Sequence, residues 1–339
     1  MPMYREHALA ELVQVRRHRQ QAAVRQLAEY RSAFLRWDER SGVRRKPRRT
    51  LGEPADDAIY FPPELLPAVN HRLVRDEGAE FVRRLLVCRL YGYLDFTTEL
   101  EELAVIPVAG RISRGRAGLD LPERMRADAF KIVTDEAWHA QFSYDFAEQV
   151  EARTGVPRPR SGTQAFVGRL DMVRNRLPAA ARGLESLLFA IVSETLTTGI
   201  LADIPRDTRL PDAVRDLVRD HGEDEGRHHV YFRTLLRHLW PALTTAQRQA
   251  VGPLLPEIVF AFLEPDYFQI GACLRSCGLA ADATEQVLLE SWPVDCVVSD
   301  AAVAASPVVQ YFGMVGALDD PGTAAAFEEA GLLHEHVSS

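Results

Sequence analysis

The feature of the sequence that most constrains its fold is the pattern Asp-Glu-x-x-His, which occurs twice, in residues 135–139 (DEAWH) and 224–228 (DEGRH). On an α-helix, a Glu and a His three residues apart lie on one face, so a carboxylate oxygen and an imidazole nitrogen can reach one metal ion. Among the 10 histidines of the chain, only His139 and His228 follow a glutamate at this spacing. One such pair alone is usually a solvated helix surface, but the duplication indicates two helices that share a metal site.

Each motif follows an apolar helical segment that also carries glutamate, in residues 78–106 and 178–201. The candidate ligands there are Glu194 in the second segment and one of Glu99, Glu101 or Glu102 in the first. One Glu from each of two helices and Glu-x-x-His from each of the other two is the ligand set of di-iron carboxylate bundles. Buried carboxylates without a cation would each cost several kcal/mol, whereas two divalent ions formally neutralise four glutamates. The sequence therefore predicts a di-metal centre inside a four-helix bundle.

Three more residues belong to the two motifs. His221 lies four residues before Glu225 on the same helical face. A four-Glu, two-His bundle does not require it, so we expect a third histidine ligand that makes the site asymmetric; a packing role is the alternative. A metal-bound histidine normally donates its free ring nitrogen to a carboxylate. We therefore expect Asp135 to support His228 and Asp224 to support His139, with an exposed Asp as the alternative for each.

The rest of the chain has helical periodicity and no alternating strand pattern, which predicts an all-α fold. We expect a single domain, residues 1–339, with a ferritin-like di-iron four-helix bundle at about residues 72–240. An N-terminal helix, residues 4–39, and C-terminal helices within residues 244–333 are expected to pack around this core.

Prolines and charges mark the expected boundaries. Pro107 is expected to end the helix of residues 78–106, and Pro122 to open the helix that carries the first motif. The loop after residue 39 contains a basic run, RRKPRR, in residues 44–49. Without stacking aromatics such a run is more often a solvated loop than a nucleic-acid site. The net charge of −8 gives no general reason to expect nucleic acid as a partner.

Composition also bears on the compartment. The 4 cysteines form no Cys-x-x-Cys pair and no zinc spacing, and the N-terminus lacks the apolar run of a secretory signal. We find no run of roughly 20 apolar residues, the length that spans a bilayer. The sequence therefore predicts a reduced, cytoplasmic protein with no membrane or nucleic-acid partner, and it leaves a homodimer open.

Four stretches, TELEELAVIPVAGRI, DEAWH, SETLTTG and HGEDEGRHHVYF, resemble the aureothin-type family of non-haem di-iron N-oxygenases. That family uses four Glu and three His, and its additional His stands four residues before the last Glu. The resemblance implies that Glu101, rather than Glu99 or Glu102, is the first ligand, because its distances to Pro107 and Glu136 suit the family pattern best. The implied ligand set is Glu101, Glu136, His139, Glu194, His221, Glu225 and His228.

The resemblance further implies two iron ions and dioxygen, used to oxidise the amino group of a small molecule to a hydroxylamine, nitroso or nitro group in natural-product biosynthesis. Electrons would come from an external donor or reductase, since the chain has no nucleotide-binding GxGxxG loop and no cysteine set for an iron-sulfur cluster. The expected pocket residues, for each of which core packing is as good an interpretation, are Tyr93, Thr97, Leu196, Thr197 and Thr198.

Two other functions compete with this one. A di-iron C–H hydroxylase or desaturase would use the same core, because the pocket decides the reaction. Ferritin-like iron storage fits less well, since the chain has roughly twice the length of a storage bundle. An arginine that pairs with a substrate carboxylate would identify the substrate class, but the sequence alone does not select one.

Overall fold

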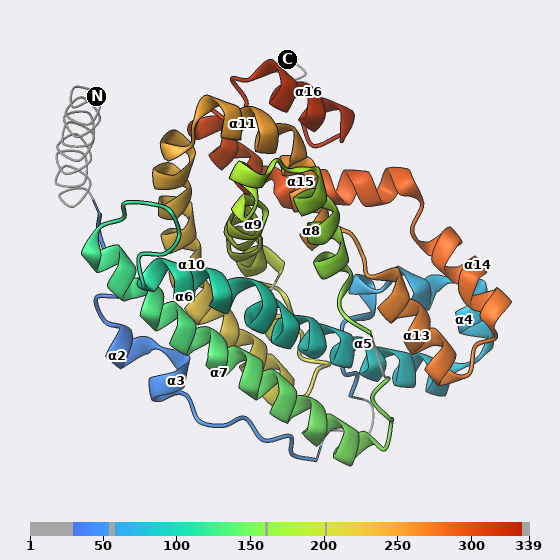
Figure 1. Ribbon diagram of the computed structural model, residues 1–339. Helices are drawn as coiled ribbons and strands as arrows, with labels where there is room; N and C mark the ends of the chain where they lie inside the picture. The colour runs from blue at the N-terminus through green and yellow to red at the C-terminus, as the bar shows by residue number, and fades with distance from the viewer. Residues whose placement is uncertain (1–29, 54–57, 160–161, 201, 334–339) are drawn as a thin grey trace, which may run out of the picture.

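Four long helices form the centre of the protein, as a computed structural model shows for residues 30–53, 58–159, 162–200 and 202–333 (Figure 1). Helix α5 packs along α7, and α9 packs along α10. No strand occurs in these described residues, so the expected all-α, ferritin-like bundle is confirmed. The four helices are α5 (Ala79–Leu100), α7 (Glu123–Thr154), α9 (Leu184–Ile200) and α10 (Asp212–Ala242).

Both motif-bearing helices begin directly after a proline and present buried polar side chains to the centre. Pro122 precedes α7, as the sequence predicts, and Pro211 precedes α10. Helix α7 ends where Gly155 takes a left-handed conformation with φ 66°, which stops the helix without a Cβ clash. Each helix exceeds 30 residues, so each motif lies well inside a rigid element rather than at a frayed end.

The helix that begins at residue 79 does not end at Pro107, contrary to expectation. A π-helical turn, η3 (Glu101–Val105), connects α5 to α6 (Ile106–Ser113), in whose first turn Pro107 lies. A proline needs no backbone partner in a first turn. Since the wide turn ends just before it, Pro107 is accommodated and the chain stays helical to Ser113.

The N-terminal helix predicted for residues 4–39 is wrong for the part that the structure describes; residues 4–29 lie outside it. Residues 30–36 contain no helix, with turns at 33–36, and are followed by the short helices α2 (Trp37–Arg40) and α3 (Gly42–Arg45) and by chain without regular secondary structure. Tyr30, Phe34 and Trp37 are buried against the bundle, so tertiary contacts override the local helical pattern. We call residues 30–53 the strap.

Shorter helices cover the other sides of the bundle. Helix α8 (Ala165–Arg176), which the sequence analysis missed, packs with α9 against α12 (Leu255–Leu263). Helix α13 (Tyr267–Cys277) packs on α5 and against α14 (Ala281–Ser291), near α4 (Arg72–Asp76). The remaining elements are η1 (Pro63–Leu65), η2 (Pro67–Asn70), η4 (Ala179–Ala181), η5 (Ile204–Arg206), α11 (Thr245–Val251), η6 (Gly252–Leu254), α15 (Val294–Met314) and α16 (Pro321–Glu329).

Helix α15 departs from the expectation that no segment is apolar enough to span a bilayer. An 18-residue window of this 21-residue helix reaches a mean hydropathy of 1.2, enough by length and composition alone, and 33% of that window is buried. The helix packs on α9 and α12, and its buried residues include Ala305 and Phe312. A core helix of a soluble protein passes the same test, so α15 is weak support for a membrane span.

Candidate metal centre

The seven predicted ligands meet inside the bundle as two groups of four that share Glu225. Within each group, the candidate ligand atoms all lie within 4.8 Å of one another, and every member is buried. The first group joins the π turn η3 and α7 to α10, and the second joins α7 and α9 to α10. The groups are Glu101, His139, His221 and Glu225, and Glu136, Glu194, Glu225 and His228.

Two glutamates occupy positions between the motif histidines. Glu136 Oε2 lies 2.7 Å from His139 Nδ1, and Glu136 Oε1 lies 2.8 Å from His228 Nδ1. Glu225 Oε1 lies 3.4 Å and 3.5 Å from the same two nitrogens, and 3.1 Å from His221 Nε2. Each carboxylate can therefore reach both metal positions, which is the arrangement of a bridging ligand.

Unsatisfied polar atoms converge on this centre. Several of its buried oxygens and nitrogens form no hydrogen bond among the described residues, since even the close pair of Glu136 Oε1 and His228 Nδ1, 2.8 Å apart, lacks hydrogen-bond geometry. Buried polar groups in folded proteins almost always form one. Carboxylate oxygens and imidazole nitrogens are ligands that iron and other divalent ions accept. The donor set thus fits two metal ions. The unpaired atoms are Glu101 Oε2, Glu136 Oε1, both carboxylate oxygens of Glu194 and of Glu225, His221 Nε2 and His228 Nδ1.

The pKa shifts of the buried glutamates and histidines also favour bound positive charge at this centre. Burial, reinforced by repulsion from neighbouring glutamates, raises the pKa of Glu101 and of Glu194 well above the usual range. Burial acts in the same direction on Glu225, but the surrounding histidines outweigh it and hold its pKa well below that range. Burial opposes the charged form of His139, yet adjacent carboxylates raise its pKa to about 10. Without metal, protons take the place of the missing positive charge.

The structure places the two motif aspartates crosswise, against the histidine of the other motif. His228 Nε2 lies 3.2 Å from Asp135 Oδ2, and His139 Nε2 lies 3.2 Å from Asp224 Oδ2. Each histidine thus directs Nδ1 at the centre and can donate Nε2–H to a carboxylate, which fixes the ring and its tautomer.

The strap supplies donors to both aspartates, which the sequence analysis missed. The Trp37 indole N–H donates to Asp135 at 2.8 Å, and the backbone N–H of Gly42 donates to both oxygens of Asp224, at 3.1 and 3.0 Å. Arg227 also pairs with Asp224. Trp37 and Gly42 lie in a segment that the pattern assigned to one long helix and its following loop, so no sequence signal pointed to these contacts.

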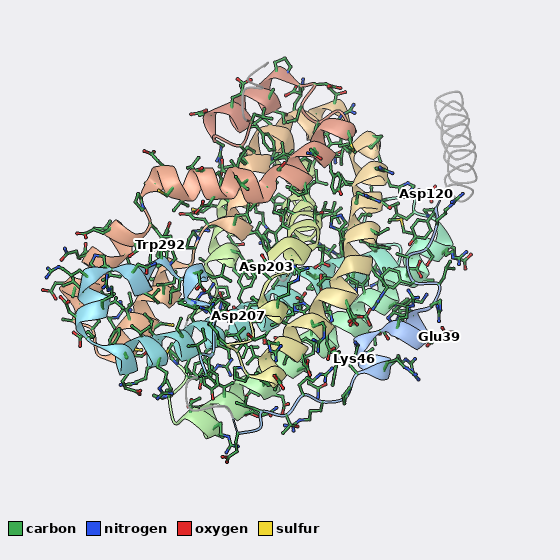
Figure 2. The ribbon with its side chains drawn as sticks, turned by 180° about the vertical axis from the view of Figure 1, so that it is seen from behind. Glu39, Lys46, Asp120, Asp203, Asp207 and Trp292 are labelled. Carbon is green, nitrogen blue, oxygen red and sulfur yellow. The ribbon has the colours of Figure 1, made fainter. Side chains whose placement is uncertain are left out.

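Three residues of the basic run pair with acidic residues of the bundle, whereas Arg44 and Arg45 are exposed, as expected for a solvated loop. Lys46 lies 3.2 Å from Asp220 and 2.6 Å from Glu223 on α10, and Arg49 lies 2.7 Å from Asp220. Arg48 lies 2.6 Å from Asp145 on α7. The strap therefore holds α7 and α10 together beside the metal centre, and Figure 2 shows its residues Glu39 and Lys46 on the side of the molecule away from Trp292.

A cavity of about 260 Å³ reaches the centre at His221. Of the expected pocket residues, Tyr93, Thr97 and Thr197 line it, and the Tyr93 hydroxyl lies 3.3 Å from His221 Nδ1. Leu196 instead belongs to the hydrophobic core, since adjacent helical residues point in different directions. The side chain of Thr198 lies outside the described part of the structure.

Comparison with known proteins identifies relatives over most of the chain. The family described as P-aminobenzoate N-oxygenase AurF matches residues 47–286. A 4-aminobenzoate N-oxygenase from Streptomyces thioluteus is 25% identical over 249 residues, which cover 72% of this chain and 74% of that relative. The matched range contains all seven residues of the two groups and most of the pocket, but only the last part of the strap.

Proposed function

The chain belongs to the P-aminobenzoate N-oxygenase AurF family and is an amine-oxidising enzyme, and we propose that it carries out this reaction with two iron ions held by the two residue groups. The observation that carries the proposal is the pair of buried four-residue groups that share Glu225 and open onto a cavity at His221. We infer that Glu101, His139, His221 and Glu225 would hold one iron, and that Glu136, Glu194, His228 and the shared Glu225 would hold the other.

The bound irons would supply the activation of dioxygen, and this chain's own residues would supply binding and control. Asp135 and Asp224 accept the Nε2 protons of the motif histidines and keep their Nδ1 atoms free for metal. Tyr93 contacts His221 at the edge of the cavity, where both side chains line the space that a substrate would occupy. The apolar walls of the cavity exclude water from the reacting amine.

The stoichiometry of amine oxidation determines which reactants the chain must receive from outside. Oxidation of an amine to a hydroxylamine with one dioxygen also forms water, and therefore consumes two electrons and two protons. We propose a separate electron donor or reductase and a small aromatic amine, like the aminobenzoate in the name of the relative. A cytoplasmic location and a role in natural-product biosynthesis complete the proposal.

A single-turnover experiment tests the reaction and its closest alternative. The protein is loaded with Fe²⁺ without oxygen, mixed with 4-aminobenzoate, exposed to ¹⁸O₂, and the products are separated by chromatography and mass spectrometry. We expect iron-dependent ¹⁸O on nitrogen, and no product from 4-methylbenzoate, which offers a C–H bond but no amine. Ring- or methyl-hydroxylated products in place of N-oxygenated ones would establish the C–H hydroxylase instead.

A further inference from the structure

The strap connects the metal centre to the surface of the protein through an indole ring. The Trp37 N–H lies 2.8 Å and 2.9 Å from the two carboxylate oxygens of Asp135, and Asp135 Oδ2 lies 3.2 Å from His228 Nε2. The other ring nitrogen, His228 Nδ1, lies 2.8 Å from Glu136 inside the centre. Three side chains thus form a continuous path of hydrogen bonds from the strap to a proposed metal ligand.

Aromatic groups of the strap cover His228 and lead outward from it. The Phe34 ring stacks on His228 with 6.0 Å between the ring centres and 24° between the planes. Trp37 is 7% exposed, and the guanidinium of the exposed residue Arg44 lies 5.0 Å from the centre of its ring. Electron transfer through a protein slows steeply with distance and is faster through bonds, hydrogen bonds and π systems than across gaps. The path through Trp37 therefore has the features of an electron route from the surface to the centre.

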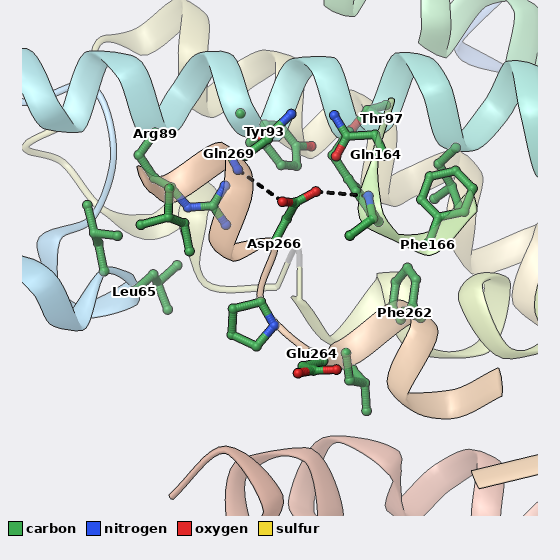
Figure 3. A pocket seen from close by; sticks show the side chains of 18 of the residues that line it. Leu65, Arg89, Tyr93, Thr97, Gln164, Phe166, Phe262, Glu264, Asp266 and Gln269 are labelled. Carbon is green, nitrogen blue, oxygen red and sulfur yellow. Dashed lines mark hydrogen bonds between the residues drawn. The ribbon is translucent and has the colours of Figure 1, made fainter. Parts of the chain in front are cut away.

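The substrate cavity reaches the centre from another direction. It meets the residue group of His221, and Figure 3 shows Tyr93 and Thr97 of α5 and Gln269 of α13 among its lining residues. In the part of the chain that the structure describes, no residue of the strap lines this cavity. A protein bound at the strap would therefore leave the cavity open to substrate.

The strap is basic, although the protein as a whole is acidic. Residues 30–49 contain eight basic and two acidic residues, whereas the net charge of the chain is −8. An acidic partner is repelled by the net charge of the chain and attracted to a basic patch, and such steering raises the rate of encounter. Lys46, Arg48 and Arg49 pair with the bundle. The exposed arginines of the strap outside these pairs include Arg31, Arg40, Arg44 and Arg45.

We propose that electrons enter the metal centre through Trp37, from an acidic protein that carries an iron–sulfur cluster or a flavin and docks on the strap. The carrier is oxidised by one electron at a time, and two such transfers reduce two ferric ions to the ferrous state. Trp37 and Asp135 are unchanged at the end, and no covalent bond forms or breaks. The use of these electrons in amine oxidation rests on the proposed function; the docking surface and the route do not.

Binding measurements test the docking surface without any redox chemistry. Full-length protein loaded with redox-inert Zn²⁺ is titrated calorimetrically with a plant-type ferredoxin and with a flavodoxin, both of which are acidic electron carriers. We expect at least one of them to bind, and to bind more weakly as the salt concentration rises. Absence of salt-dependent binding by both carriers overturns the docking surface.

Arginine variants locate the binding on the strap. The double variant Arg44→Gln/Arg45→Gln should weaken binding of the carrier about threefold or more, because two charges are lost from the interface. Arg72→Gln/Arg75→Gln is the matched control, since these arginines are also exposed but lie on α4, far from α2 and α3 (Figure 1). An equal effect of the two double variants would contradict docking on the strap.

Stopped-flow reduction of the oxidised, iron-loaded protein tests the route, with each rate taken per bound iron. Trp37→Phe should slow reduction by the tighter-binding carrier about tenfold or more. It should leave reduction by dithionite unchanged, because this small ion can reach the centre through the cavity. Trp138→Phe is the matched control and should keep the rate with the carrier, since Trp138 neighbours His139 on α7 but packs against Phe142.

Thermal unfolding checks that each variant is folded. A carrier rate unchanged in Trp37→Phe overturns the route. Equal slowing with carrier and dithionite also overturns it, because Trp37 would then act only by positioning Asp135. N-oxygenation without Trp37-dependent reduction would refute this route alone, whereas Trp37-dependent reduction without N-oxygenation would refute the function alone.

Discussion

The contact between Gly42 and Asp224 allows a sharp test of how the strap supports the metal centre. Gly42 donates its backbone N–H to the carboxylate that holds His139. A Cβ at position 42 would lie 2.5 Å from Asp224 Oδ2, the oxygen nearest His139 Nε2. Because that approach is closer than any carbon–oxygen contact allows, Gly42→Ala must displace either the strap or the aspartate.

The expected loss of stability has two sources, the hydrogen bond from Gly42 to Asp224 and the steric crowding by a new Cβ. A hydrogen bond to a charged group contributes about 1.5–3 kcal/mol, and crowding in a packed interior costs about 1–3 kcal/mol. Loss of a carboxylate that orients a metal-bound histidine typically weakens metal binding about 10- to 100-fold. Gly42→Ala should therefore lower both the free energy of unfolding and the affinity for Fe²⁺, while every proposed ligand remains in place.

The assay is anaerobic competition for Fe²⁺ against a chromogenic chelator, with thermal unfolding of the loaded protein measured in parallel. Gly52→Ala is the matched control, since it makes the same change in the same strap at a position where a Cβ meets nothing within 4 Å. If Gly42→Ala and Gly52→Ala bind Fe²⁺ as tightly as the unchanged protein, the strap does not position His139 through Asp224, and the reasoning fails.

Three further predictions concern other parts of the site. Chelation of the metal should lower the midpoint of thermal unfolding, and more so as pH rises from 6.5 toward about 10, because folded metal-free protein keeps protons on groups such as His139 that the unfolded chain releases; a pH-independent loss would contradict this. Gly92→Ala should raise the KM for an arylamine substrate by crowding the cavity, since a Cβ there would lie 2.9 Å from Gln269 Oε1, while stability stays equal or rises because Ala favours helix over Gly by roughly 0.5–1 kcal/mol; steady-state kinetics and melting curves check both. Trp37→Phe should weaken Fe²⁺ binding by removing the indole donor to Asp135, and unchanged competition against the chelator would show that the bond is dispensable.

The helices that carry the proposed metal ligands could be predicted because each sequence pattern lies within a single helix. The 3.6-residue period and the duplicated motif place Glu136 with His139, and Glu225 with His228, on single helical faces. The crossed pairing of Asp135 and Asp224 followed from the chemistry of metal-bound histidine. None of these steps required knowledge of contacts between distant segments.

The contacts that depend on distant segments could not be predicted. Trp37 and Asp135 are 98 residues apart, and Gly42 and Asp224 are 182 apart, so no local pattern connects them. Residues 30–39 of the strap were assigned to one long helix because apolar residues there have helical spacing, whereas Tyr30, Phe34 and Trp37 are buried against the bundle from irregular chain, turns and the short helix α2. The two arginines that line the cavity, Arg89 and Arg169, could not be distinguished from the other arginines of the chain, since the packing of α5 and α8 against other helices places them there.

The π turn η3 makes the centre sensitive to the length of the chain rather than only to its composition. In this turn the N–H of Ile106 reaches back five residues, to the carbonyl of Glu101, instead of four. Deleting one residue from this stretch would restore an ordinary α-helix and keep all seven glutamates and histidines. It would also remove the wide turn and redirect the side chains within it. Glu101 would then leave its present position 3.9 Å from His221, so a single-residue deletion would disturb the candidate metal centre although no proposed ligand is lost.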